Sequence, residues 1–97
     1  MNSSSLEYPT FSLKDKVALI TGAGRGLGRT CALALANAGA DIALGLRDVK
    51  TASDLESEIK EMGRKVIRVQ MDVTTVKEIR NAVDGVINRF GRIDVLV

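Results

Sequence analysis

Four glycines and one arginine within seven positions form the stretch of this sequence best suited to chemistry. They are Gly22, Gly24, Arg25, Gly26 and Gly28. Glycine accepts left-handed backbone and lets an anion approach without meeting a Cβ atom. The segment that follows, 29–38, is rich in Ala and Leu and predicts a helix. Because the first turn of a helix has free N–H groups at the positive end of its dipole, we predict a phosphate-binding turn here.

A buried strand must hold this turn in place. The run Val17 to Thr21 is apolar or β-favouring throughout, which is typical of a strand covered on both faces and hence of a parallel sheet. We expect the strand to end at the glycines, and the first helix to run from about Gly26 to Ala38, where Gly39 ends it. The turn then lies where the carboxyl end of a strand meets the start of a helix, a common site for nucleotide phosphates.

Three nucleotide-binding patterns compete for the glycines, and their spacing separates them. The phosphate loop of NTPases needs glycine at position 23 and lysine at position 29, but the sequence has Ala and Arg there. The common dinucleotide pattern Gly-x-Gly-x-x-Gly fails as well, because Leu27 stands where its third glycine belongs. The pattern that fits is Thr-Gly-x-x-x-Gly-x-Gly, met by Thr21, Gly22, Gly26 and Gly28.

In these residues the sequence resembles the short-chain dehydrogenase/reductase family, over roughly 13–97. The resemblance implies NAD or NADP on a Rossmann sheet, and it places at the phosphates Gly22, Gly24, Arg25, Gly26, Leu27 and Gly28. It also implies that Asp72 accepts a hydrogen bond from the adenine amino group and that the backbone N–H of Val73 meets the ring. A turn without a ligand is the alternative for the glycines. For Asp72 a turn or helix-entry role is the alternative, and its two roles are compatible.

The remaining chain alternates between strand and helix patterns. The expected strands lie at 42–46, 66–71 and 94–97. Two capping boxes open the helices between them, formed by Thr51 with Asp54 and by Thr75 with Glu78, and these helices end at Gly63 and Gly91. The alternation predicts the first half of a Rossmann-type, three-layer α/β/α fold, with a parallel sheet in strand order 3-2-1-4. The first two helices then cover one face of the sheet and the third covers the other.

The end of the second strand bears on the choice between NAD and NADP. NAD enzymes usually place a carboxylate there to hold the ribose 2′-OH. Here Leu46 stands at that position and Arg47 follows it. Arginine can hold a 2′-phosphate with a forked pair of charged hydrogen bonds, and Arg25 can add a second cation. Asp48 argues for NAD, but it lies two positions past the strand end and is interpreted as a turn residue. The sequence thus predicts NADP as the cofactor, with NAD as the alternative.

Catalytic residues cannot be assigned in this sequence. The resemblance implies an Asn, a Ser and a Tyr-x-x-x-Lys pair, which we expect C-terminal to Val97, since Tyr8 is the only tyrosine and has no lysine four residues after it. We expect residues 1–12 to be a disordered tail and residues 13–97 to be an NAD(P)-binding Rossmann domain, truncated before the catalytic half. The implied reaction is hydride transfer between nicotinamide and a carbonyl or alcohol, like that of 3-oxoacyl reductases or of sugar and gluconate dehydrogenases. The alternative is a non-catalytic dinucleotide-binding or assembly module.

Composition excludes several other classes. The net charge of +2 arises from 14 basic and 12 acidic residues spread along the chain, with one tyrosine and two phenylalanines, so no basic patch or stacking platform for nucleic acid is expected. No apolar run approaches the ~20 residues that span a bilayer, and no signal peptide is evident, so we expect a cytoplasmic location without membrane contact. The absence of histidine and the single Cys31 leave no metal site. The resemblance implies a homo-oligomer, a dimer or tetramer, at full length.

Overall fold

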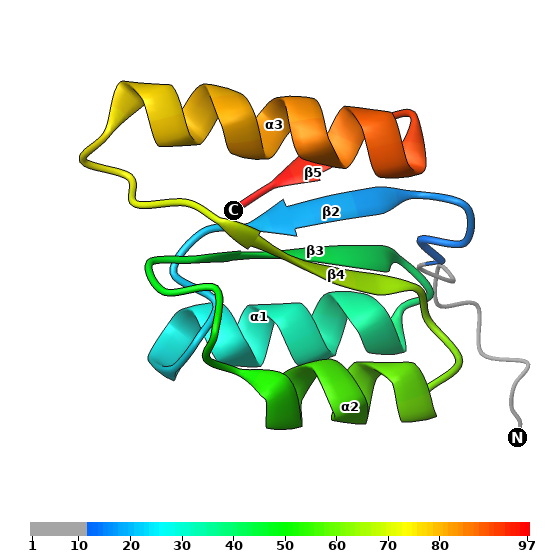
Figure 1. Cartoon of the computed structure of the whole chain (residues 1–97). Coiled ribbons are helices and arrows are strands. Elements are labelled where there is room, and N and C mark those ends of the chain that lie inside the picture. Colours follow the sequence, from blue (N-terminus) through cyan, green and yellow to red (C-terminus); the bar gives the residue numbers. More distant parts are fainter. Residues whose placement is uncertain (1–11) are drawn as a thin grey trace, which may run out of the picture.

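The computed structural model describes residues 12–97 and confirms the predicted alternation of strands and helices (Figure 1). The elements in chain order are β2 (Val17–Ile20), α1 (Gly26–Asn37), β3 (Asp41–Leu46), α2 (Ser53–Glu61), β4 (Val66–Gln70), α3 (Val76–Phe90) and β5 (Val95–Leu96). Each boundary lies within two residues of the expected one. Of the predicted tail, residues 1–11 lie outside the described part of the chain.

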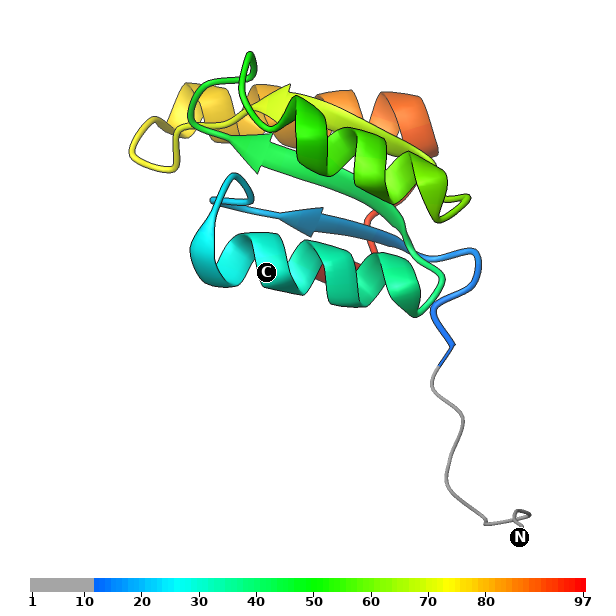
Figure 2. The same cartoon turned by 90° about the horizontal axis from the view of Figure 1, so that it is seen from below.

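The four strands form one parallel sheet in the order β4-β3-β2-β5, which confirms the predicted order and places the first strand in the interior. Helices α1 and α2 cover one face of the sheet and α3 covers the other, so that the molecule has three layers (Figures 1 and 2). Within residues 12–97, no helix is long and apolar enough to cross a membrane.

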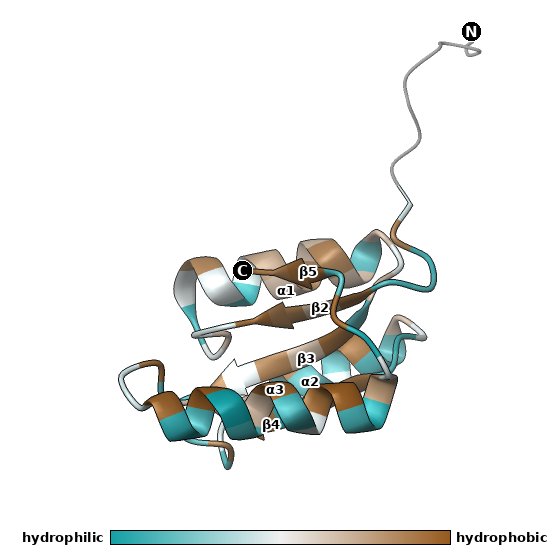
Figure 3. Ribbon diagram, turned by 90° about the horizontal axis from the view of Figure 1, so that it is seen from above, coloured by the Kyte–Doolittle hydropathy of each residue, from teal (hydrophilic) through white to brown (hydrophobic). Residues whose placement is uncertain are grey.

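Two apolar clusters, one on each face, hold the layers together. All four residues of β2 are buried because the strand is covered on both faces, as its continuous apolar sequence predicts. Ile20 of β2 and Leu44 of β3 pack with α1 and α2, whereas Leu19 packs toward Val86 of α3. Full burial of one such aliphatic side chain contributes about 1.5–3 kcal/mol to the free energy of unfolding. Figure 3 shows the apolar residues running along β2 and β5 and alternating with polar ones on α3.

The capping box predicted for α2 is wrong. Ala52, in a left-handed conformation with φ 63°, is the residue before the helix, and no side chain caps it. The Thr51 hydroxyl instead donates to the carbonyl of Asp48 at 2.6 Å. The carboxylate of Asp54 accepts a hydrogen bond from Arg29 of α1 at 2.8 Å. The Asp54 carboxylate is therefore bound by a neighbouring helix and does not take part in a capping box.

The capping box predicted for α3 is wrong as well, although the helix begins after Thr75 as expected. The Thr75 side chain makes no cap hydrogen bond. Glu78 reaches past it, and its Oε1 atom accepts from the backbone N–H of Asp72 at 2.9 Å. Glu78 thus ties the start of α3 to the turn that follows β4, and this contact becomes part of the site described below.

Candidate functional site

The turn between β2 and α1 has a shape that only glycine can supply at its narrowest point. Gly22 and Gly26 both have left-handed backbone, with φ of 59° and 63°. A Cβ atom on Gly28 would lie 2.2 Å from the carbonyl oxygen of Gly22, which is far inside van der Waals contact. The first residues of α1 therefore pack directly on the backbone of the turn. The N–H of Ala23 donates to the carbonyl of Gly45 at 3.2 Å and joins the turn to β3.

The start of α1 carries no negative charge of its own. Arg25 is the residue before the helix, its backbone is extended, and its side chain makes no cap hydrogen bond. No acidic residue lies in the first turn of the helix, and Leu27 in that turn is 79% exposed. The free N–H groups and the positive end of the helix dipole thus face an open region, which suits an anionic ligand.

A pocket of about 770 Å³ lies between this turn and the segment that links β3 to α2. Its lining residues are Gly22, Gly24, Arg25, Leu46, Arg47, Asp48, Thr51 and Gln70. The structure therefore brings together four predicted cofactor residues, namely Gly22, Gly24, Arg25 and Arg47. The other predicted residues, Gly26, Leu27, Gly28, Asp72 and Val73, are not part of the lining.

Leu46 and Arg47, adjacent at the end of β3, differ sharply in exposure. Leu46 is 1% exposed and belongs to the apolar cluster beneath the pocket, so it offers no polar group to a ribose. The side chain of Arg47 is 89% exposed, and its Nε atom lies 3.9 Å from Oδ2 of Asp72. This long, exposed ion pair leaves most of the guanidinium N–H donors of Arg47 available to a ligand.

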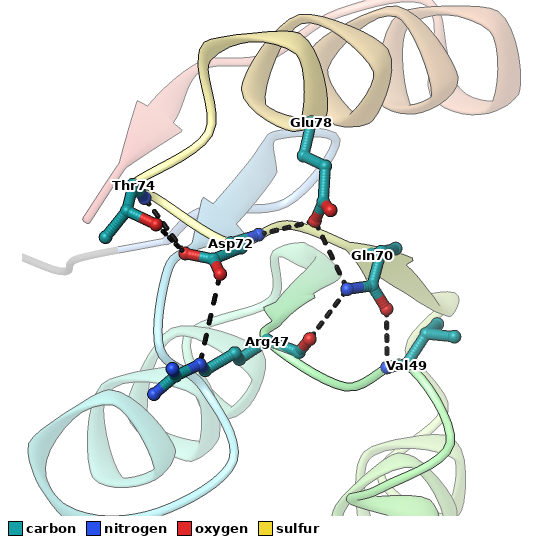
Figure 4. A network of polar contacts seen from close by, with 6 residues as sticks. All are labelled: Arg47, Val49, Gln70, Asp72, Thr74 and Glu78. Atoms are coloured by element: carbon teal, nitrogen blue, oxygen red, sulfur yellow. Dashed lines mark hydrogen bonds and ion pairs between the residues drawn. The ribbon is translucent and has the colours of Figure 1, made fainter.

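Asp72 is held as a turn residue between β4 and α3, which confirms one of its two expected roles. Its Oδ1 atom accepts from the hydroxyl and the backbone N–H of Thr74, at 2.7 and 2.9 Å (Figure 4). These two hydrogen bonds, followed by the charge of Arg47, hold the pKa of Asp72 below its ordinary value. Oδ2 faces Arg47 instead of the pocket. The adenine contact of Asp72 and of Val73, which is 56% exposed, stays a prediction.

Asp48 also acts as a turn residue, as expected from its position in the sequence. Its Oδ1 atom accepts from the N–H of Lys50 at 3.0 Å, and its carbonyl accepts from the N–H of Thr51 at 3.0 Å. One carboxylate oxygen is therefore already engaged within the segment that links β3 to α2. Asp48 still lines the pocket, so its negative charge lies close to any ligand that binds there.

Gln70, the last residue of β4, was not predicted from the sequence as a site residue. Its Nε2 atom donates to the carbonyl of Arg47 at 2.6 Å and to Oε1 of Glu78 at 3.2 Å, and its Oε1 atom accepts from the N–H of Val49 at 3.0 Å. Figure 4 shows this amide between the two chain segments. The only available signal was a polar residue at the end of a strand pattern, which by itself does not indicate a partner 21 or 23 residues away.

The chemistry that this arrangement can perform is binding and orientation. Within residues 12–97, no group of three His, Cys, Asp or Glu side chains could hold a metal ion. Left-handed glycines, a helix start without acidic residues and an exposed arginine beside a pocket fit a phosphate-bearing nucleotide. A nicotinamide dinucleotide carries a pyrophosphate and, in NADP, a further phosphate on the adenosine ribose, and therefore fits this donor set.

Comparison with known proteins agrees with this geometry. The family model described as short chain dehydrogenase matches residues 16–97. A hydroxynaphthalene reductase of Aspergillus fumigatus is 40% identical over 86 residues, which cover 88% of this chain and 32% of that protein. The family model covers the glycine turn, the residues that line the pocket, and helices α1, α2 and α3.

Solved structures give the same result for the fold. A short-chain type dehydrogenase/reductase from Mycobacterium marinum has a TM-score of 0.85 and 37% identity, over 90% of this chain and 35% of that one. A 7α-hydroxysteroid dehydrogenase, solved with NADH and 7-oxo glycochenodeoxycholic acid, has a TM-score of 0.84 and 31% identity, over 90% and 34% of the two chains. The chain thus spans about a third of the length of the relatives it matches.

Proposed function

The chain belongs to the short-chain dehydrogenase/reductase family of oxidoreductases, and we propose that it forms the cofactor-binding part of an NADP(H)-dependent member. In this proposal residues 13–97 are the NAD(P)-binding domain, and the reaction transfers a hydride between nicotinamide and a carbonyl or alcohol carbon. The groups that move the proton are expected C-terminal to Val97. When bound, NADPH would donate a hydride to a carbonyl carbon or NADP+ would accept one from an alcohol carbon, and the described residues would bind and orient the cofactor.

The observation that supports NADP over NAD is the pairing of Leu46 with Arg47 at the end of β3. A NAD site would place a carboxylate there for the ribose 2′-OH. Leu46 is buried and apolar, whereas Arg47 extends from the same edge with an exposed guanidinium. Arg25 lines the same pocket, so two cations are available to the 2′-phosphate.

The glycine turn is assigned to the pyrophosphate, and the turn after β4 to the adenine. The turn presents the free start of α1, to which the backbone of Gly22, Gly24 and Gly26 allows close approach. In the proposal Asp72 and Val73 receive the adenine ring, as the family resemblance implies. Because Asp72 pairs with Arg47, the adenine and 2′-phosphate contacts share one side-chain pair.

The substrate is proposed only as a class, a small carbonyl or alcohol compound. A hydroxynaphthalene reductase and a 7α-hydroxysteroid dehydrogenase are similar to this chain, and 3-oxoacyl reductase-like and sugar dehydrogenase-like activities stay as candidates. The full-length protein is proposed to be cytoplasmic and homo-oligomeric. A second candidate, a non-catalytic dinucleotide-binding module, uses the same pocket and differs only in lacking turnover.

The cofactor proposal is tested by titrating NADP and NAD into protein that contains residues 1–97. Arg47→Ala should weaken NADP binding about 10- to 100-fold, because a charge-assisted hydrogen bond contributes about 1.5–3 kcal/mol, and should leave NAD binding unchanged. Arg47→Lys keeps the charge but loses the forked geometry of the guanidinium, so its NADP affinity should lie between those of the parent protein and of Arg47→Ala. Arg89→Ala, in the last turn of α3, is the matched control.

Two results would contradict the proposal. One is tighter binding of NAD than of NADP by the parent protein. The other is equal NADP affinity in the parent protein and in Arg47→Ala.

A further inference from the structure

The segment that links β3 to α2, residues 47–52, holds one strained conformation although much of it is exposed. Ala52 has left-handed backbone with φ 63°, which L-residues with a Cβ atom rarely adopt. The side chain of Arg47, at the other end of the segment, is 89% exposed, and its Nε atom lies 3.9 Å from Oδ2 of Asp72. Asp48 accepts hydrogen bonds within the segment, from Lys50 and Thr51, but a strained segment of this kind also needs contacts from the surrounding structure to hold its shape.

Those contacts come from two alternate residues of β4. Arg68 donates from Nη1 to the carbonyls of Val49 and Thr51, both at 3.1 Å. Gln70 donates to the carbonyl of Arg47 and accepts from the N–H of Val49. Two side chains of one strand thus make four hydrogen bonds to the backbone of the segment.

The contacts of Gln70 need an amide and determine which way it points. Its Nε2 atom faces two acceptors, the Arg47 carbonyl at 2.6 Å and Glu78 at 3.2 Å, while its Oε1 atom faces one donor, the Val49 N–H at 3.0 Å. A carboxylate could accept from Val49 but could donate to neither acceptor, and it would also face the charge of Glu78. The position therefore distinguishes Gln from Glu, which has the same shape.

Glu78 extends the contact to the second half of the site. One oxygen, Oε1, accepts both from Gln70 Nε2 and from the backbone N–H of Asp72. Gln70 is thus linked at one end to the backbone of Arg47 and, through Glu78, to the backbone of Asp72 (Figure 4). These are the two residues whose side chains form the ion pair beside the pocket.

We infer that Gln70 is a positioning residue for cofactor specificity: it holds the backbone of Arg47 so that the guanidinium reaches the 2′-phosphate of NADP. The inference rests on the proposed function, because it acts through Arg47. Gln70 touches the segment through the backbone of Arg47 and Val49. Its loss therefore leaves the charge of Arg47 in place and removes two of the hydrogen bonds that hold the backbone of the segment that carries this charge.

The experiment replaces the amide and measures both cofactors in protein that contains residues 1–97. Gln70→Met removes all three contacts at similar volume, and Asn88→Met, at an exposed amide on α3, is the matched control. We expect Gln70→Met to weaken NADP binding about three- to tenfold, the usual cost of ordering one or two side chains on binding, with NAD binding unchanged. The control should keep the parent affinities for both cofactors.

A readout without cofactor follows the contact itself. The N–H of Val49 is a donor to Gln70, so its hydrogen exchange, measured by NMR, should be faster in Gln70→Met and unchanged in Asn88→Met. Gln70→Glu keeps the acceptor for Val49 and should protect this N–H while still weakening NADP binding. Adding Glu78→Gln to Gln70→Glu removes the repulsion between two carboxylates but gives the Arg47 carbonyl no donor, so the NADP deficit should persist.

The outcomes separate this inference from the proposal beneath it. If Arg47→Ala leaves NADP binding unchanged, the proposed function fails and this inference with it. If Arg47→Ala weakens NADP binding but Gln70→Met keeps the parent ratio of NADP to NAD affinity, the inference alone is overturned. Equal loss of NADP and NAD binding in Gln70→Met, or full recovery in the double variant, would show a merely structural role and would also overturn it.

Discussion

The three helices of residues 12–97 begin at the same edge of the sheet, yet among them only α1 begins without an acidic residue. Helix α2 has Asp54 and Glu56 in its first turn and α3 has Glu78, whereas α1 has none. None of the three helices has a side-chain cap hydrogen bond at its start. The helices therefore share the same positive dipole end and differ in whether the chain itself supplies the compensating negative charge.

The difference sets the proposed ligand site apart from an ordinary helix start. In α2 and α3 the first-turn carboxylates are engaged by other elements, Asp54 by Arg29 and Glu78 by the turn after β4. Helix α1 instead begins over a glycine turn that opens to solvent. The sheet edge alone does not make an anion site, since two of its three helix starts already carry an anion of the protein's own.

The largest expected effect comes from removing the close approach that forms the α1 start. In Gly28→Ala, the new methyl group meets the Gly22 carbonyl at 2.2 Å, so the turn must open. We expect dinucleotide binding to weaken by about 100-fold, in line with the roughly 3 kcal/mol upper range for an overpacked site. Isothermal titration with NADP measures this change.

Gly85→Ala, in the middle of α3, is the control, because its Cβ atom would meet no atom within 4 Å. It should bind NADP like the parent and should be more stable by up to about 1 kcal/mol, the difference in helix propensity between Gly and Ala. Parent-like NADP binding by Gly28→Ala would show that the ligand does not depend on this turn.

A second prediction concerns a variant in which α1 begins with an acidic residue in its first turn, as α2 and α3 do. Leu27→Glu adds an exposed carboxylate to the first turn, which should raise the free energy of unfolding of the cofactor-free protein by about 0.3–1 kcal/mol. The same charge should repel the pyrophosphate and weaken NADP and NAD alike by about tenfold, which corresponds to about 1.4 kcal/mol. Denaturant titration and cofactor titration measure the two opposite effects.

Leu27→Gln serves as the control for this pair, because it has the same length as the glutamate without its charge. Its cofactor affinities should stay close to those of the parent. Equal affinities in Leu27→Glu and Leu27→Gln would mean that the anion does not bind at the start of α1.

The smallest expected effect concerns the start of α2, whose first turn already contains carboxylates of the protein. The hydrogen bond from Arg29, and then that from the backbone of Leu55, hold the pKa of Asp54 below its ordinary value. Because the folded pKa lies below the unfolded one, the stabilisation is complete above the unfolded pKa and is lost as the pH falls through the folded pKa. It is small, since the side chain of Asp54 is 73% exposed.

Asp54→Asn should therefore lower the thermal midpoint slightly at neutral pH, and the difference from the parent should shrink below about pH 4. Thermal unfolding followed by circular dichroism between neutral pH and about pH 3 measures it. Asp84→Asn, which removes an exposed carboxylate in the middle of α3, is the control. A difference that grows toward acid pH would contradict the assignment of the Arg29 contact as stabilising.

Most of the fold could be predicted from local pattern, and the errors lie where distant side chains compete with it. The continuous apolar run of β2 and the glycine that follows each helix are local properties, and both were confirmed. The two capping boxes satisfied the spacing rule and were nevertheless wrong. Asp54 found a donor 25 residues away in Arg29, and Glu78 found its donors before the helix, at Asp72 and Gln70.

For the candidate site, sequence identified the chemical groups better than their arrangement. Four predicted residues line the pocket, while Asp72 turns its carboxylate toward Arg47 and Thr74. Gln70 was missed because the role of an amide at a strand end can be recognised only when the folded chain shows which segment it contacts.

By itself, the sequence determined the alternation of elements, the parallel sheet order and the glycine turn at the start of α1, because apolar periodicity and the backbone freedom of glycine are properties of neighbouring residues. Only the tertiary structure decided which helix starts are filled by the protein's own carboxylates and which is left open. It also decided that Gln70 of β4 holds the backbone of Arg47, 23 residues earlier in the chain. Hydrogen bonds over such separations depend on how parallel strands bring their carboxyl ends to one edge, which no local pattern encodes.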